Sequence, residues 1–144
     1  MSDLLADPAI IAVNIVTTPE EMPVAETIDL VGRLRQEVAV PLGVVVVNRV
    51  LPELFTHADE ETFEALHAPD SQRSLTNELG HGAVEVLDAA RLAVSLRRTR
   101  AVHLAELHDA VDLPLLYVPY LFVRAHGLRV TRMVADALGQ ELGL

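Results

Sequence analysis

The feature that most constrains the fold is a strand–helix–strand pattern between residues 9 and 50. Residues 9–17 (AIIAVNIVT) and 42–50 (LGVVVVNRV) are rich in β-branched side chains, as buried parallel strands are. Residues 23–38 lie between them and place apolar side chains at helical spacing, namely Val24, Ile28, Val31, Leu34 and Val38. We therefore expect a βαβ unit with a right-handed crossover.

The rest of the chain predicts one more strand and two more long helices. Residues 51–75 mix Pro, Asp, Ser and His, which is typical of a variable segment of loop and short helix. A long helix is expected over residues 78–111, and the last helix over 126–142. The third strand is expected over residues 115–122 (LLYVPYLF) and should end or sit exposed at Pro119, because proline cannot donate to a strand ladder.

This order of elements predicts a single α/β domain over residues 1–144. Its architecture would be three-layer, with a partial open parallel sheet of about three strands and helices on its faces. Such a sheet is thin, and its edge needs a partner or further strands.

Composition excludes several classes of function. The net charge of −10 over 144 residues argues against a nucleic-acid partner. All 11 basic residues are Arg, so there is no lysine for a phosphate-binding loop or a Schiff base. The lack of Cys rules out thiolate metal sites and Cys nucleophiles. No apolar run reaches the ~20 residues that span a bilayer. Acidic residues stand where a signal peptide has basic ones, so we expect a cytoplasmic location.

The ends of the three expected strands carry polar residues or a proline. They are Thr17–Glu20, Asn48–Arg49 and Val118–Tyr120. The carboxyl ends of parallel strands meet on one edge, which is where open α/β sheets bind ligands. The side-chain amide of Asn48 can bond both donor and acceptor edges of a purine. A plainer interpretation is that Asn48 turns the chain and Pro119 stops the strand.

The stretch over residues 16–53, VTTPEEMPVAETIDLVGRLRQEVAVPLGVVVVNRVLPE, resembles the second half of an ArsA-type ATPase. This family includes arsenite-pump ATPases and ATPases that target tail-anchored membrane proteins. Its pattern is T-x-P-E after a strand, E-T in the next helix, and a Val-rich strand ending in N-R or N-Q. Further on, Leu113-Pro114-Leu115-Leu116, Val118-Pro119 and Gly127 match the family's later strand, its V-P motif and the following glycine. The resemblance covers nearly the whole chain except residues 51–75.

The resemblance implies the C-terminal half of a P-loop NTPase-like domain that uses ATP or ADP. In the family, the Asn that ends the Val-rich strand bonds the adenine, and the V-P loop packs around the same base. Carried over by position, the cofactor-binding residues are Asn48, Arg49, Val118, Pro119 and Tyr120. The resemblance gives this chain no catalytic residue and no metal ligand.

The chain departs from the family where phosphates would bind. It has no GxxxxGK[ST] loop, and the family's switch segments with their catalytic and magnesium-binding aspartates lie upstream of the matched part. We therefore expect weak binding of the adenine moiety, Mg²⁺ only where another segment supplies a P-loop, and no hydrolysis by this chain alone. At the V-P loop, Tyr120 and Arg124 replace the family's Leu and Glu. The CxxC zinc clasp of the tail-anchor-targeting relatives is excluded, because there is no Cys.

These expectations describe an adenine-binding segment of an anion-transporting or protein-targeting ATPase. Its partner would be an N-terminal P-loop-containing segment or a second copy of the chain. A membrane pump or a client protein would be a further partner. The alternative is a non-catalytic interaction module that dimerises. A flavodoxin-like response domain is disfavoured, because the first strand lacks an acidic cluster to hold a metal.

Histidines and arginines elsewhere favour structural roles. His103 and His108 are five residues apart and do not share a helical face, which disfavours a metal site. A basic cluster on the long helix predicts a solvated, salt-bridged surface in so acidic a chain. Its members are Arg91, Arg97, Arg98 and Arg100.

Overall fold

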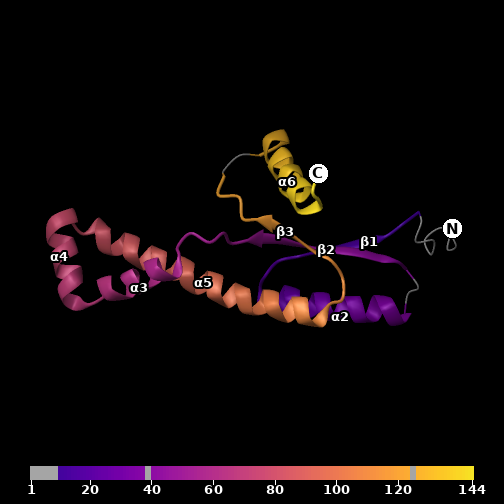
Figure 1. Ribbon diagram of the computed structural model, residues 1–144, viewed down its shortest axis with the longest axis horizontal. Helices are drawn as coiled ribbons and strands as arrows, with labels where there is room; N and C mark the ends of the chain where they lie inside the picture. The colour runs from indigo at the N-terminus through magenta and orange to yellow at the C-terminus, as the bar shows by residue number, and fades with distance from the viewer. Residues whose placement is uncertain (1–9, 38–39, 124–125) are drawn as a thin grey trace. The chain divides into compact units, whose positions relative to one another are not determined.

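The computed structural model describes residues 10–37, 40–123 and 126–144, and these form three strands and five helices (Figure 1). In chain order they are β1 (Val13–Thr17), α2 (Glu21–Glu37), β2 (Leu42–Val50), α3 (His57–Leu66), α4 (Pro69–Leu79), α5 (Gly82–Ala110), β3 (Leu115–Pro119) and α6 (Leu128–Leu142). The strands form one parallel sheet in the order β1-β2-β3. The predicted α/β class with a partial, P-loop NTPase-like sheet is confirmed.

The chain divides into two compact units. Unit 1 comprises Met1–Leu51 and Arg100–Leu144 and contains the whole sheet. Unit 2 is Pro52–Thr99, and all of its regular secondary structure is helical. Helix α5 is shared, since its residues up to Thr99 belong to unit 2 and those from Arg100 to unit 1.

The core of unit 1 lies on one face of the sheet. Val45 and Val47 of the central strand β2 are fully buried. Side chains of α2 and of the last turns of α5 pack over them, so these two helices cover this face (Figure 1). The buried members of the cluster are Ile15, Val24, Val31, Val45, Val47, Leu107 and Val111. Helix α6 packs against β3 on the opposite face, which completes the three layers (Figure 1).

A bulge fixes how β1 aligns with β2. Val13 pairs with Leu42 but Ile15 pairs with Val45, so β2 has one extra residue over this interval. The side-chain Oδ1 of Asn14 accepts the backbone N–H of Val44 at 3.0 Å. A polar side chain from β1 thus bonds a main-chain group that the bulge takes out of the regular ladder.

The two outer edges of the sheet differ. At β3, the backbone N–H of Tyr117 donates to Glu141 Oε2 of α6 at 3.0 Å, so a side chain occupies that edge. Burial, and secondly the Glu141 charge, raise the pKa of the Tyr117 phenol above its ordinary value. Among the described residues nothing pairs with the outer edge of β1, and Val16 there is 67% exposed. Within the described part of the chain, a side chain therefore covers one position of the β3 edge, whereas the β1 edge has no partner.

The strands follow the sequence-based prediction closely, and the helices less so. Strand β2 has the expected bounds, and β3 ends at Pro119 as predicted. Helix α2 begins at Glu21 rather than at residue 23. Strand β1 begins at Val13 rather than at residue 9: residues 10–12 precede the strand, and residue 9 lies outside the described residues.

Residues 51–75 are more helical than predicted. They contain α3, which a capping box between Thr56 and Asp59 begins, and most of α4, which begins at Pro69. Gly80, at φ 84°, ends α4, so the long helix begins only at Gly82. The segment expected to be loop and short helix thus contains most of two helices.

No helix within the described ranges is long and apolar enough to cross a membrane.

Candidate functional site

The carboxyl ends of β1, β2 and β3 lie on one edge of the sheet, which we call the rim. They end at Thr17, Val50 and Pro119, and all three strands run parallel. The backbone N–H of Tyr120 donates to the Val50 carbonyl at 2.8 Å, so β2 and the chain leaving β3 stay joined at the rim. The structure thus brings together the strand ends at which the sequence placed candidate residues.

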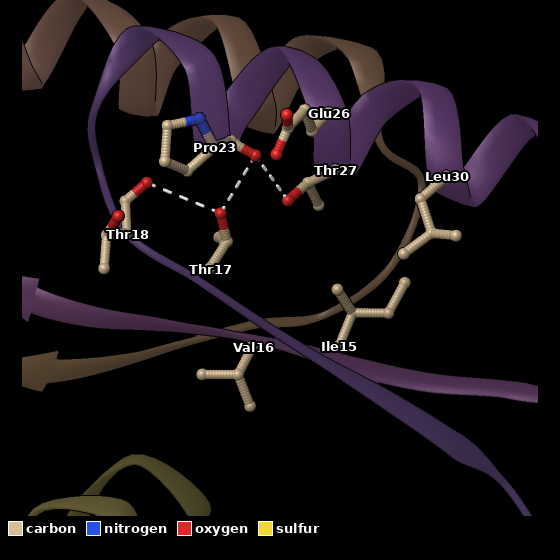
Figure 2. A pocket seen from close by; sticks show the side chains of 8 residues that line it. All are labelled: Ile15, Val16, Thr17, Thr18, Pro23, Glu26, Thr27 and Leu30. Atoms are coloured by element: carbon tan, nitrogen blue, oxygen red, sulfur yellow. Dashed lines mark hydrogen bonds between the residues drawn. The ribbon is translucent and has the colours of Figure 1, made fainter.

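The segment after β1 is tightly held. Thr17 is 6% exposed, and its hydroxyl donates to the Pro23 carbonyl at 3.1 Å (Figure 2). Thr27 donates to the same carbonyl at 2.7 Å, which ties the end of β1 to the first turns of α2 (Figure 2). Pro19 is fully buried. The T-T-P-E stretch therefore sets the path from strand to helix.

Asn48 forms a turn with its neighbour. Its Oδ1 accepts the backbone N–H of Arg49 at 2.9 Å, and Arg49 adopts φ 60°, in the left-handed region. The register supports this conformation, since Val47 pairs with Tyr117 but Val50 pairs with Pro119. Asn48 and Arg49 therefore sit in a bulge at the end of β2.

The bulge leaves part of the Asn48 amide available to a ligand. Asn48 is half-buried, and its Nδ2 makes no hydrogen bond to any residue that the structure describes. Oδ1 also has a second lone pair beyond the one that Arg49 uses. One amide can thus turn the chain and still present a donor and an acceptor. The neighbouring Arg49 side chain is exposed.

The segment after β3 presents aromatic side chains. Val118 is 2% exposed, so its side chain belongs to the interior, whereas Pro119 is exposed. Tyr120 is 38% exposed and lies against Phe122, with ring centroids 4.7 Å apart at 50°. Phe122 is 65% exposed. This exposure is unusual because the chain has only five aromatic residues, two Tyr and three Phe. Arg124 lies outside the described residues.

Sequence reasoning missed two residues of the rim region. Phe122 could have been suspected, because it is a second aromatic residue, two positions after Tyr120, in the segment that follows the strand-ending proline. Arg100 of α5 could not, because its partners are far away in the sequence. Its NH2 group lies 2.8 Å from Glu20 Oε1, and Glu20 also accepts the Thr18 hydroxyl. Two other arginines of the cluster pair within unit 2, Arg97 with Glu53 and Arg98 with Glu60.

The rim fits a flat heterocycle better than it fits phosphates or a metal. A half-buried amide and exposed ring faces suit a base. The carboxylate of Glu20, the acid of the T-T-P-E stretch, is already bound to Arg100 and Thr18. Within the described ranges, no three His, Asp or Glu side chains are grouped to hold a metal ion. The one carboxylate of this stretch that the structure describes at the rim, that of Glu20, is thus engaged by protein groups.

A shallow groove of about 300 Å³ lies beside the open edge of β1 (Figure 2). Ile15 and Leu30 line its apolar side, and Leu30 is 42% exposed. Figure 2 shows Ile15 directed toward α2 and Val16 directed to the opposite face of the strand. The groove is thus continuous with an unpaired strand edge.

The chain matches the model of a known protein family. The family model for anion-transporting ATPases (ArsA ATPase) matches residues 1–79. The matched range includes β1, α2 and β2, and hence the T-T-P-E stretch and Asn48. A comparison with curated proteins found no match.

Proposed function

This chain belongs to the anion-transporting ATPase family, and on that premise we propose that it forms the adenine-binding half of an ArsA-type nucleotide-binding domain. The observation that carries the proposal is the rim, where three parallel strands end together with Asn48, Pro119 and Tyr120 beside the ends. Family membership supports the use of a nucleotide and Mg²⁺, and the chemistry of the rim supports the base.

In this proposal the Asn48 amide recognises the edge of the adenine. Nδ2 donates to a ring nitrogen, and the second lone pair of Oδ1 accepts from the exocyclic amine. Pro119 and Tyr120 cover a face of the base, and the buried Val118 forms the floor beneath them. Arg49 is exposed beside Asn48 and supplies a positive charge to the α-phosphate side.

The β- and γ-phosphates need a second segment. The chain has no lysine and no glycine-rich phosphate loop, so it offers no cationic cradle for them. We propose that a P-loop-containing segment adds its strand along the open edge of β1. The groove beside β1 offers Ile15 and Leu30 for that contact, while Glu141 occupies the opposite edge of the sheet. Hydrolysis, and any pump or client protein, would involve the completed domain.

A second candidate function is a non-catalytic module that dimerises. The observation in its favour is that apolar side chains on β1 and α2 are exposed, since Val16 is 67% exposed and Leu30, in the groove beside β1, is 42% exposed. Two copies joined at β1 would cover these side chains without any nucleotide.

Titration calorimetry with AMP, ADP and ATP separates the two functions. An adenine site without a phosphate cradle binds all three weakly, with affinities within about threefold of one another. Asn48→Ala should abolish this binding, whereas the control Asn77→Ala on an exposed part of α4 should leave it unchanged. Absence of binding at millimolar nucleotide, together with a stable dimer by light scattering, would establish the module instead.

A further inference from the structure

Arg100 connects two of the three strand ends. It lies on the part of α5 that belongs to unit 1, and its side chain is only 21% exposed. Its NH2 lies 2.8 Å from Glu20 Oε1, after β1, and its NH1 lies 3.5 Å from the Arg49 carbonyl oxygen, at the end of β2. One guanidinium thus reaches both segments from a helix that covers the sheet.

Glu20 is itself fixed at several points. One carboxylate oxygen accepts the Thr18 hydroxyl and the other accepts Arg100. The Glu20 carbonyl accepts the backbone N–H of Val24 at 3.1 Å, so Glu20 also anchors the first turn of α2. The carboxylate therefore holds the guanidinium in a defined place relative to β1 and α2.

Arg49 is contacted on both sides of its backbone. Its N–H is bound by Asn48 Oδ1, and its carbonyl faces Arg100. A left-handed conformation is disfavoured for a residue with a side chain, so it persists where surrounding contacts hold it. Arg100 and Asn48 supply such contacts, one at the Arg49 carbonyl and one at its N–H.

We infer that Arg100 is a positioning residue, which holds the Arg49 peptide so that Asn48 presents its amide to the base. This inference rests on the proposed function for its ligand, but its geometric part can be tested without one. A purely structural ion pair between α5 and the β1 segment would contribute little to stability and would leave Asn48 unaffected.

The test compares Arg100→Met with the matched control Arg98→Met. Arg98 is on the same helix and pairs with Glu60 in unit 2, so the control removes an equal charge and an equivalent ion pair. In ¹⁵N–¹H spectra without ligand, Arg100→Met should shift the signals of the Asn48 side-chain amide and the Arg49 backbone amide. The control should leave both in place.

Nucleotide binding supplies the second readout. Arg100→Met should weaken AMP binding about fivefold, as expected when one supporting contact of a recognition group is lost. Arg100→Lys keeps the charge beside Glu20 and should recover at least half of the loss in binding free energy. Arg98→Met should bind AMP as the unmodified chain does.

The outcomes separate the two claims. Unchanged Asn48 and Arg49 signals in Arg100→Met would overturn the positioning role, even if AMP binds. Failure of the unmodified chain to bind AMP would overturn the proposed function, while shifted signals would still support the coupling. If heat unfolding shows that Arg100→Met does not fold, Glu20→Gln replaces it and should shift the same signals to a smaller extent.

Discussion

Gly43 is the position at which a single added methyl group tests how β1 is aligned on β2. A Cβ at Gly43 would overlap the Asn14 Oδ1 atom, which bonds the backbone N–H of Val44. Asn14 is exposed, so its side chain can swing away, but the hydrogen bond is then lost. This bond lies at the bulge between Val13 and Ile15, where the register of β1 on β2 shifts.

The magnitude follows from three contributions. Loss of the bond to Val44 costs ~1 kcal/mol of unfolding free energy. A displaced Asn14 rotamer adds ~0.5 kcal/mol. Replacement of glycine by alanine returns ~0.5 kcal/mol through the unfolded state, since no left-handed conformation is required here. Gly43→Ala should therefore destabilise the chain by about 1 kcal/mol.

A double-mutant cycle tests this reasoning with urea unfolding of four proteins. In the Asn14→Ala background the overlap is gone, so Gly43→Ala should stabilise by ~0.5 kcal/mol. Equal m-values across the four proteins would show that the comparison is valid. An identical effect of Gly43→Ala in both backgrounds would refute the proposed contact, because it would show that Asn14 and Gly43 do not interact.

Two further predictions concern stability. Leu107→Ala, at a fully buried position, should lower the unfolding free energy by ~3 kcal/mol, while Val102→Ala on the exposed side of the same helix should change it by less than ~0.5 kcal/mol; equal urea midpoints would contradict the assigned core. Hydrogen bonds from the Thr56 side chain, and secondly from its backbone, hold the pKa of Asp59 below its ordinary 3.8. This stabilisation of α3 is fully present above pH 3.8 and is lost as the pH falls through the lowered value, so helicity by circular dichroism should decline there less steeply in Asp59→Asn.

The strands were predictable because their signals are local. The β-branched run of β2 is preceded by Pro41. Pro119 ends β3 because proline has no N–H to donate to the strand ladder. The parallel orientation of the first two strands also follows from the helix between them. The sequence thus predicted that Asn48 lies at a strand end on the rim.

Helix α4 was not predictable in the same way. It has no buried residue, so no apolar stripe marks it against the polar sequence around it. Its start at Pro69 is visible only once a helix is already suspected. The sequence also did not show that the two interpretations of Asn48, chain turn and ligand contact, are compatible. A turn through Oδ1 leaves Nδ2 available, so they are compatible.

The two edges of the sheet differ, and this difference relates the fold to the proposed addition of a phosphate-binding segment. An edge strand exposes main-chain donors and acceptors, and proteins usually cover or interrupt such an edge. At β3, Glu141 does so by accepting the Tyr117 N–H, whereas β1 has an apolar groove and an exposed Val16 instead. An edge so equipped favours the addition of a further strand. In a family that hydrolyses ATP, a strand added there would bring its own carboxyl end to the same rim as Asn48, because parallel strands end together.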